Sequence, residues 1–327
     1  MSAGSAPAGR EFNDMVLADL ILSRAETQPD LDVLTFEHLS VDDGATADEV
    51  RTYADLTDNA NRIAAALIAR GIEPGDRFAI MMRNHPEFVE TMIAASILGA
   101  VFVPIDPRTR GDRLVYMIEA SGCRGLVTSD VCLAEIDLVR SRLGALRWVL
   151  ALGTGEAPAD LAAAGWAEPL GAALASSAPT VDVRTDDPEA PLQIMYTSGT
   201  TGDPKGIVGT NYRFCAAGML GYLFEYRPDE RPYTGLSLTH GNSQSVTLAP
   251  ALLMGLRAVY SRRFTRSRLW EVCRRYDFTT FSILGGMATA IYSEAPRPDD
   301  ADNPVRMVVS GGMPAVLWEE FEARFGV

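Results

Sequence analysis

One segment of the chain, Tyr196 to Ile207, combines hydroxyl side chains, glycines and a lysine at a spacing suited to binding an anion. It reads YTSGTTGDPKGI, and Lys205 is the only lysine in a chain whose other basic residues are all arginine. Its first two glycines allow successive backbone N–H groups to turn toward one anion, and its hydroxyls add donors for phosphate oxygens. Lysine supplies a flexible point charge, whereas arginine supplies a rigid planar fork. The segment therefore predicts a phosphate-binding loop.

Two common phosphate loops do not fit this segment. A Walker A loop needs GxxxxGK[ST], but here Pro204 precedes the lysine and Gly206 follows it, which disfavours a P-loop kinase. The spacing of the glycine-rich loop of protein kinases fails as well. A solvated Gly/Ser/Thr turn between two strands is the alternative without function. Eleven consecutive positions that fit one pattern, Tyr196 to Gly206, disfavour it.

The same eleven residues resemble the signature of the adenylate-forming (AMP-binding) superfamily, which includes acyl-CoA synthetases, peptide-synthetase adenylation domains and beetle luciferases. That signature is [YT]-[ST]-S-G-[ST]-T-G-x-P-K-G, and the chain matches it without departure. Other segments resemble further blocks of the family: Thr52–Leu56, Gly75–Ile80, Leu236–Gly241 (with Ser237 where proline is usual) and Ser310–Pro314. The resemblance covers most of the chain. It favours the acyl-CoA synthetase branch, including crotonobetaine/carnitine-CoA-ligase-like enzymes.

The resemblance implies roles for particular residues. The residues expected to bind the phosphates of ATP are Thr197, Ser198, Gly199, Thr200, Thr201, Gly202 and Lys205. Thr197 is also the candidate for contact with the α-phosphate or Mg²⁺. The residues expected to line the adenine–acyl junction are Gly311, Gly312 and Met313. By residue type alone His240 is more readily structural than catalytic, but its match to the family's L-P-x-x-H segment reverses that preference. The predicted catalytic residues are therefore Lys205, His240 and Thr197.

The acyl pocket is expected to draw on residues 240–245 and 283–289. There, Gly285 and Gly286 are interpreted as leaving space for a bulky or ringed acid. A peptide adenylation domain would normally place an aspartate near Asn242 and Ser243, and this chain has none there.

The function implied by the resemblance is ATP-dependent activation of a carboxylic acid to an acyl-adenylate, with release of pyrophosphate. Thioester formation with coenzyme A follows in the full-length enzyme, so ATP, Mg²⁺ and coenzyme A are the expected cofactors. One alternative is an adenylation enzyme that loads an aryl or amino acid onto a phosphopantetheine carrier protein. Another is a non-catalytic nucleotide- or acyl-binding fragment.

Composition excludes several other partners. The chain has 327 residues and a net charge of −14. Because proteins bind nucleic acids and anionic membranes through a basic face, this charge argues against both partners. Its longest apolar run, residues 92–105, is shorter than the roughly 20 residues that span a bilayer. Four separated cysteines without a C-x-x-C pair, and only three histidines, argue against a zinc site or a disulfide framework. We expect reduced thiols and a cytoplasmic location.

The elements that must position these residues alternate between strands and helices. The expected strands are 78–82, 101–105, 125–128, 148–151, 192–196, 258–260, 281–284 and 305–309. The expected helices are 55–70, 86–98, 112–121, 131–143, 212–224, 247–254, 267–276 and 315–325. This order predicts an α/β fold of mostly parallel sheets layered with helices.

Residues 1–14 are expected to form a flexible lead and residues 15–327 an N-terminal AMP-binding (adenylation) domain, with a surface connection at about 153–191. In the family, this domain is followed by a Y-G-x-T-E segment, a ribose-binding aspartate, a hinge and a mobile C-terminal domain with a catalytic lysine. None of these is in this sequence. We therefore expect an N-terminal-domain fragment that is impaired or inactive alone. Its oligomeric state, monomer or homodimer, stays open.

Overall fold

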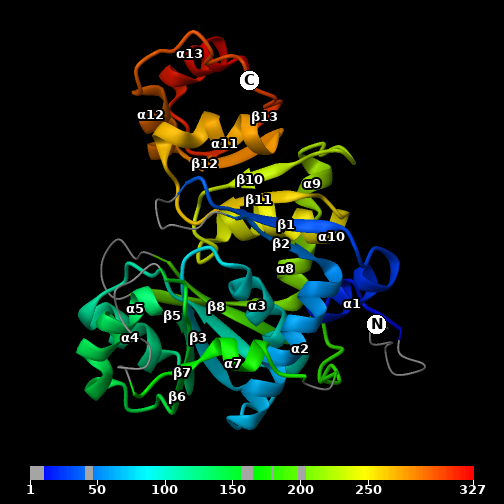
Figure 1. The fold of residues 1–327 in the computed structure, drawn as a ribbon, viewed down its shortest axis with the longest axis vertical. Coiled ribbons are helices and arrows are strands. Elements are labelled where there is room, and N and C mark those ends of the chain that lie inside the picture. The colour runs from blue at the N-terminus through cyan, green and yellow to red at the C-terminus, as the bar shows by residue number, and fades with distance from the viewer. Residues whose placement is uncertain (1–10, 41–46, 156–164, 178–179, 198–203) are drawn as a thin grey trace. The chain divides into compact units, whose positions relative to one another are not determined.

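The computed structural model describes residues 11–40, 47–155, 165–177, 180–197 and 204–327. The chain divides into two compact units, each made of two stretches of sequence. The first comprises Met1–Asp30 and Tyr53–Cys215, and the second Leu31–Thr52 and Ala216–Val327. Each unit contains one sheet and its covering helices (Figure 1). The predicted α/β class of mostly parallel sheets layered with helices is confirmed.

The first unit is built on a seven-stranded sheet in the order β7-β6-β5-β3-β4-β8-β9. Its neighbouring strands are parallel, apart from the antiparallel pair β8 and β9 at one edge. The strands are β3 (Arg77–Met81), β4 (Val101–Pro104), β5 (Gly125–Ser129), β6 (Trp148–Leu152), β7 (Glu168–Pro169), β8 (Pro191–Thr197) and β9 (Lys205–Thr210). Parallel strands joined by helices end at the same edge of a sheet, which is where ligands usually bind in such folds.

Helices cover both faces of this sheet. Figure 1 shows α4 and α5 on one side of it and α2 and α3 on the other. The helices are α1 (Leu17–Thr27), α2 (Tyr53–Ala69), α3 (Pro86–Leu98), α4 (Gly111–Ala120), α5 (Asp130–Val139), the 3₁₀ turn η1 (Arg140–Arg142), α7 (Leu170–Leu174) and α8 (Asn211–Ala217), whose last two residues are assigned to the second unit. Every residue of α3 is buried, and Gly99 ends that helix in the left-handed region at φ 63°.

The second unit has a six-stranded sheet in the order β13-β12-β10-β11-β1-β2. Only β2 runs antiparallel to its neighbour. The strands are β1 (Asp32–Glu37), β2 (Glu49–Thr52), β10 (Pro232–Thr234), β11 (Ala258–Ser261), β12 (Thr280–Leu284) and β13 (Met307–Gly311).

The core of the second unit is rich in aromatic rings. Tyr233 of β10 stacks on Phe278, with ring centroids 4.3 Å apart and planes 7° from parallel. Phe321 and Phe325 of the last helix join the same cluster, and both are buried. The helices of this unit are α9 (Leu220–Leu223), the π-helix η2 (Ser243–Leu248), α10 (Ala249–Met254), η3 (Arg266–Arg268), α11 (Leu269–Tyr276), α12 (Gly285–Tyr292) and α13 (Ala315–Phe325).

Two predicted helices differ from the structure. The helix expected at 212–224 is interrupted after Ala217, and a short α9 follows. Gly218 and Gly221 weaken helix formation there, and a Cβ at Gly221 would force the Met254 side chain to move. The helix expected at 247–254 starts earlier, as the π-helix η2. Residues 153–191 include the short elements β7 and α7, which are too brief to show a hydrophobic period.

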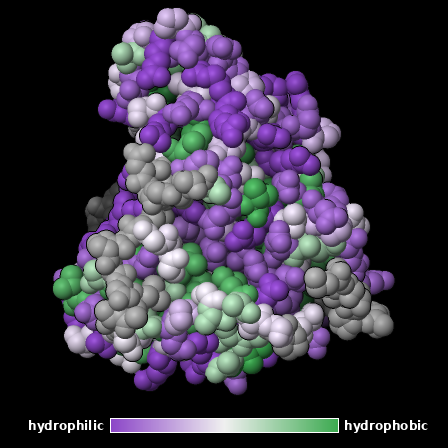
Figure 2. Space-filling view, in the orientation of Figure 1, coloured by the Kyte–Doolittle hydropathy of each residue, from purple (hydrophilic) through white to green (hydrophobic). Residues whose placement is uncertain are grey.

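Within the described part of the chain, no helix combines the length and the apolar character needed to cross a bilayer. Figure 2 shows one face of the molecule, where hydrophilic side chains dominate and apolar ones gather in separate patches. Scattered apolar exposure of this kind is ordinary for a folded protein. Most of the expected lead at 1–14 lies outside the described residues.

Candidate functional site

The two ends of the predicted phosphate loop lie side by side. Strands β8 and β9 pair antiparallel, and Thr197 is the Cα partner of Lys205. Directly opposed residues on such strands point to the same face, with Cβ atoms roughly 5 Å apart. Both side chains are exposed. The structure therefore brings the predicted hydroxyl and the predicted ammonium together at the mouth of the loop.

The remaining phosphate-binding candidates fall between these two residues. Ser198, Gly199, Thr200, Thr201 and Gly202 lie outside the described residues. Their roles stay predictions from the sequence. What the structure describes is the pair of strands from which they extend.

The charge of Lys205 is not committed to an ion pair within the described residues. Arginines, by contrast, pair repeatedly with carboxylates, for example Arg324 with Asp300 at 2.7 Å and Arg124 with Asp76 at 2.5 Å. In a chain with a net charge of −14, an exposed cation that meets no carboxylate partner in the described part of the chain is available to an anionic ligand.

The sequence placed Tyr196 in a strand and at the start of the signature, and the structure adds specific contacts for its hydroxyl. Its hydroxyl lies 2.7 Å from Ser121 Oγ and 3.4 Å from the carbonyl oxygen of Met117. Partial burial raises the pKa of the Tyr196 phenol, which the hydrogen bond from Ser121 only partly opposes. The phenol therefore stays protonated near neutral pH. No signal in the sequence pairs these residues, which are 75 positions apart.

His240 lies in the second unit, in a turn between β10 and η2. Its backbone N–H donates to the carbonyl of Ser237 at 3.0 Å. Ser243 Oγ donates to the carbonyls of Ser237 at 2.6 Å and His240 at 3.0 Å, which fixes the turn. The imidazole residue itself is exposed, and the π-helix that starts at Ser243 is a geometry often found at functional sites.

Gly311 is the last residue of β13 in the same unit, and Gly312 and Met313 follow it. Gly312 has φ 82°, a left-handed conformation that favours glycine. A Cβ on Gly285 would overlap the carbonyl oxygen of Gly312. Strand β13 and the start of α12 therefore approach each other backbone to backbone, and this approach requires glycine at position 285.

This contact corrects one interpretation from the sequence. Gly285 does not leave space for an acid, because the backbone of Gly312 fills the position. Gly286 does leave space: a Cβ there would meet no atom within 4 Å. Of the two glycines, only Gly286 fits the expected role.

The predicted site residues are thus divided between the units. Thr197 and Lys205 belong to the first, and His240, Gly312 and Met313 to the second. Among the described residues, no group of three or more His, Cys, Asp or Glu side chains could hold a metal ion.

Comparison with known proteins decides what this arrangement is. Residues 22–327 match the family described as AMP-binding enzyme. The chain belongs to the AMP-binding enzyme family. This confirms the resemblance that the loop signature indicated.

Relatives of this AMP-binding chain include acyl-CoA ligases. The medium/long-chain-fatty-acid–CoA ligase FadD6 of Mycobacterium tuberculosis is 30% identical over 284 residues, which cover 86% of this chain and 45% of that protein. The crotonobetaine/carnitine–CoA ligase of Salmonella choleraesuis is 28% identical over 279 residues, with coverages of 84% and 53%. The chain therefore spans about half the length of the curated relatives it matches.

A solved structure confirms the fold. The inhibitor-bound N-terminal domain of FACL13 from Mycobacterium tuberculosis superposes with a TM-score of 0.78 at 24% identity. The match covers 94% of this chain and 73% of that domain. The chain thus has the architecture of the N-terminal domain of an adenylate-forming enzyme.

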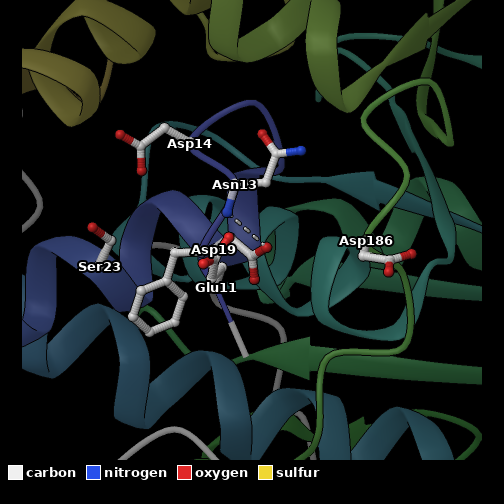
Figure 3. Close-up of a pocket in the computed structure, with 7 residues that line it drawn as sticks. Glu11, Asn13, Asp14, Asp19, Ser23 and Asp186 are labelled. Carbon is white, nitrogen blue, oxygen red and sulfur yellow. Dashed lines mark hydrogen bonds between the residues drawn. The ribbon is translucent and has the colours of Figure 1, made fainter. Parts of the chain in front are cut away.

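A cavity in the first unit has the wrong charge for a nucleotide. It measures about 620 Å³. Its lining consists of four acidic residues, Glu11, Asp14, Asp19 and Asp186, together with Phe12, Asn13 and Ser23 (Figure 3). None of the predicted site residues is in this lining. Phosphate groups would be repelled by these carboxylates, so the cavity is not the phosphate site.

Proposed function

We propose that residues 15–327 form the N-terminal adenylation domain of an acyl-CoA ligase, the part that activates a carboxylic acid with ATP. The observation that carries the proposal is the pair Thr197 and Lys205 at the base of the signature loop. Membership of the AMP-binding family supports it. The acyl-CoA ligases among the relatives favour this branch over peptide synthetases.

The proposed first step makes the acid reactive. A carboxylate oxygen attacks the α-phosphorus of ATP, so a new O–P bond forms and the bond to the β-phosphate oxygen breaks. The products are an acyl-adenylate and pyrophosphate. Such a reaction needs little covalent chemistry from the protein, which positions the reactants and neutralises charge.

The first unit would supply the phosphate contacts. Lys205 is the cation for the β- and γ-phosphates, where its flexible stem lets the ammonium follow the departing pyrophosphate. Thr197, the cross-strand partner of Lys205, would donate its hydroxyl to a phosphate oxygen or to a water of the Mg²⁺ shell. Ser198, Gly199, Thr200, Thr201 and Gly202 would add donors between them. Mg²⁺ would arrive bound to ATP, since the described residues offer no carboxylate cluster for it.

The second unit would supply contacts to the adenine and the acid. Gly311, Gly312 and Met313 are proposed for the adenine–acyl junction, and His240 for the carboxylate and α-phosphate. The open space at Gly286 is proposed as part of the acyl pocket. Thioester formation with coenzyme A would follow in the longer protein. An amino-acid pocket is disfavoured, because the stretch around Asn242 and Ser243 has no aspartate to hold an ammonium group.

The proposal is tested by titrating the chain with non-hydrolysable acyl-adenylate mimics that carry a fatty acyl, an aryl or an aminoacyl group. We expect the fatty acyl or aryl mimic to bind more tightly than the aminoacyl mimic. The tightest binding by the aminoacyl mimic would contradict the acyl-CoA ligase assignment. No binding by any mimic would contradict the adenylate site itself.

A further inference from the structure

The hydroxyl of Tyr196 connects the β8–β9 hairpin to the end of helix α4. Ser121, which follows the last residue of α4, is 2% exposed, and its Oγ lies 2.7 Å from the Tyr196 oxygen. The Tyr196 hydroxyl also donates to the Met117 carbonyl at 3.4 Å, so Ser121 acts as donor to Tyr196 in this arrangement. The Tyr196 hydroxyl thus forms hydrogen bonds with one side-chain group and one backbone group at the end of α4.

Ser121 is itself fixed. Its backbone carbonyl accepts a hydrogen bond from Arg77 Nη1 at 3.1 Å, and Arg77 is the first residue of β3. A continuous path of hydrogen bonds therefore runs from β8 through the end of α4 to the middle of the sheet. An anchor of this kind limits the movement of the edge strands.

The ring of Tyr196 lies against Gly206, the residue that follows Lys205. Tyr196 is the cross-strand partner of Gly206, and a Cβ on Gly206 would come within 3.5 Å of the ring and 2.9 Å of Ile194 Cγ2. On its other side the ring packs against the hydrophobic core and meets Tyr116 edge to face, with centroids 6.2 Å apart. The glycine after Lys205 thus lets the strand that carries the lysine rest on this ring.

We propose that Tyr196 is a positioning residue for Lys205. Its hydroxyl holds the β8–β9 hairpin against α4, and the hairpin in turn fixes the point from which the lysine side chain starts. Contact of Lys205 with ATP phosphates rests on the proposed function, whereas the anchoring of the hairpin rests on the hydrogen bonds alone. A fixed starting point lowers the entropy that the lysine loses when it binds phosphate.

The single lysine makes this anchor measurable. A lysine-specific endoprotease can cut the chain only after Lys205, and an arginine-specific one samples the rest of the chain. Under native conditions each rate reports how often its segment opens. The variants are Tyr196→Phe, Ser121→Ala and their combination. Tyr116→Phe is the matched control, since it makes the same change on the neighbouring ring and no hydrogen bond of its hydroxyl is present among the described residues.

We expect Tyr196→Phe to raise the lysine-specific cleavage rate by about 2- to 10-fold, because it loses the 2.7 Å hydrogen bond with Ser121 and the longer one to Met117. The arginine-specific rate should stay unchanged. Ser121→Ala should act in the same direction, and the double variant should exceed Tyr196→Phe only slightly, because both remove the same bond. The Kd of Tyr196→Phe for Mg·ATP should rise by a similar factor, whereas Tyr116→Phe should change neither quantity.

An unchanged lysine-specific rate in Tyr196→Phe would overturn the proposal, as would an equal rise in the arginine-specific rate. A hairpin that opens more often while the Kd for Mg·ATP stays constant would also overturn the positioning role. Failure of the wild-type chain to bind Mg·ATP would instead overturn the proposed function, and the cleavage rates would still decide whether Tyr196 anchors the hairpin.

Discussion

Thr197 and Lys205 lie opposite each other as the last matched pair that the structure describes in the β8–β9 ladder. Their pairing means that both ends of the signature loop start from one rigid, hydrogen-bonded position. Glycines and hydroxyls in the loop can then donate to phosphate while the flanks stay in place. This relationship links the sequence motif to the proposed chemistry.

Gly285 and Gly286 are neighbours with opposite surroundings, and this predicts opposite effects of substitution. Gly285→Ala would push against the Gly312 carbonyl and should lower the free energy of unfolding by about 1–3 kcal/mol. Gly286→Ala, with no atom within 4 Å of its Cβ, should leave stability unchanged or raise it by roughly 0.5 kcal/mol. Urea unfolding of both variants tests this, and equal effects would show that the backbone contact at Gly312 is not tight.

The surroundings of Glu230 predict that the stability of the second unit falls in acid. Burial alone would raise its pKa, but hydrogen bonds from Thr279, Thr280 and Arg306 lower it below the ordinary value of a glutamate. Thr280 Oγ1 and Arg306 Nη2 lie 2.6 Å and 2.5 Å from its carboxylate oxygens. Because the folded-state pKa is the lower one, this stabilisation is complete above the unfolded-state pKa, about 4.3. It is lost as the pH falls through the folded-state pKa.

Glu230→Gln should therefore reduce the free energy of unfolding by about 2–3 kcal/mol at pH 7 and by less at pH 3.5. Urea unfolding across this range measures the difference. Glu294→Gln is the control, since Glu294 pairs with Arg266 at the surface and should matter little at either pH. A penalty for Glu230→Gln that is independent of pH would contradict the account.

The four cysteines should be inert in the folded chain. All are free and buried, and burial raises the pKa of Cys123, Cys215 and Cys273 to about 12. Since the thiolate is the reactive form, reaction with Ellman's reagent at pH 8 should be slow until a denaturant exposes the thiols. Rapid reaction of any of the four in the native chain would contradict the buried positions.

The buried hydrogen bonds of Asn211 are expected to stabilise the fold at a position outside the signature loop. Its side-chain oxygen accepts from the backbone N–H of Leu17 at 3.2 Å and from Ser96 Oγ at 2.8 Å, and its amide donates to Ala190 at 3.2 Å. The residue is 1% exposed. Asn211→Ala would leave buried partners unsatisfied and should cost about 2–3 kcal/mol in urea unfolding. An effect below about 0.5 kcal/mol would contradict this role.

The sequence was informative where the signal is local. The α/β class and most of the central strands and helices follow from periodicity, and Pro86 and Gly99 mark both ends of α3 as expected. The loop signature identifies the family because eleven adjacent residues carry it. β9 was not predicted, because KGIVGT contains two glycines and forms a strand by pairing with β8. β10, with three residues, is too short to show alternation.

Relationships between distant residues could not be predicted from the sequence. Tyr196 and Ser121 meet only after α4 and β8 have packed, and no composition or spacing links them. The sequence alone suggests that Gly285 leaves open space. It cannot distinguish a glycine that is needed for close backbone approach from one that leaves a cavity. Only the position of the Gly312 carbonyl distinguishes the two cases.

The central claim, that Lys205 binds the phosphates of ATP, is tested most directly by calorimetric titration of the wild-type chain and Lys205→Ala with two ligands. Mg·ATP carries β- and γ-phosphates, whereas a non-hydrolysable acyl-adenylate mimic lacks them and serves as the internal control. We predict that Lys205→Ala raises the Kd for Mg·ATP by about 10- to 100-fold, the effect of a lost charge-assisted hydrogen bond, and leaves the Kd for the mimic nearly unchanged. An unchanged Kd for Mg·ATP would remove this lysine and its loop from the phosphate site.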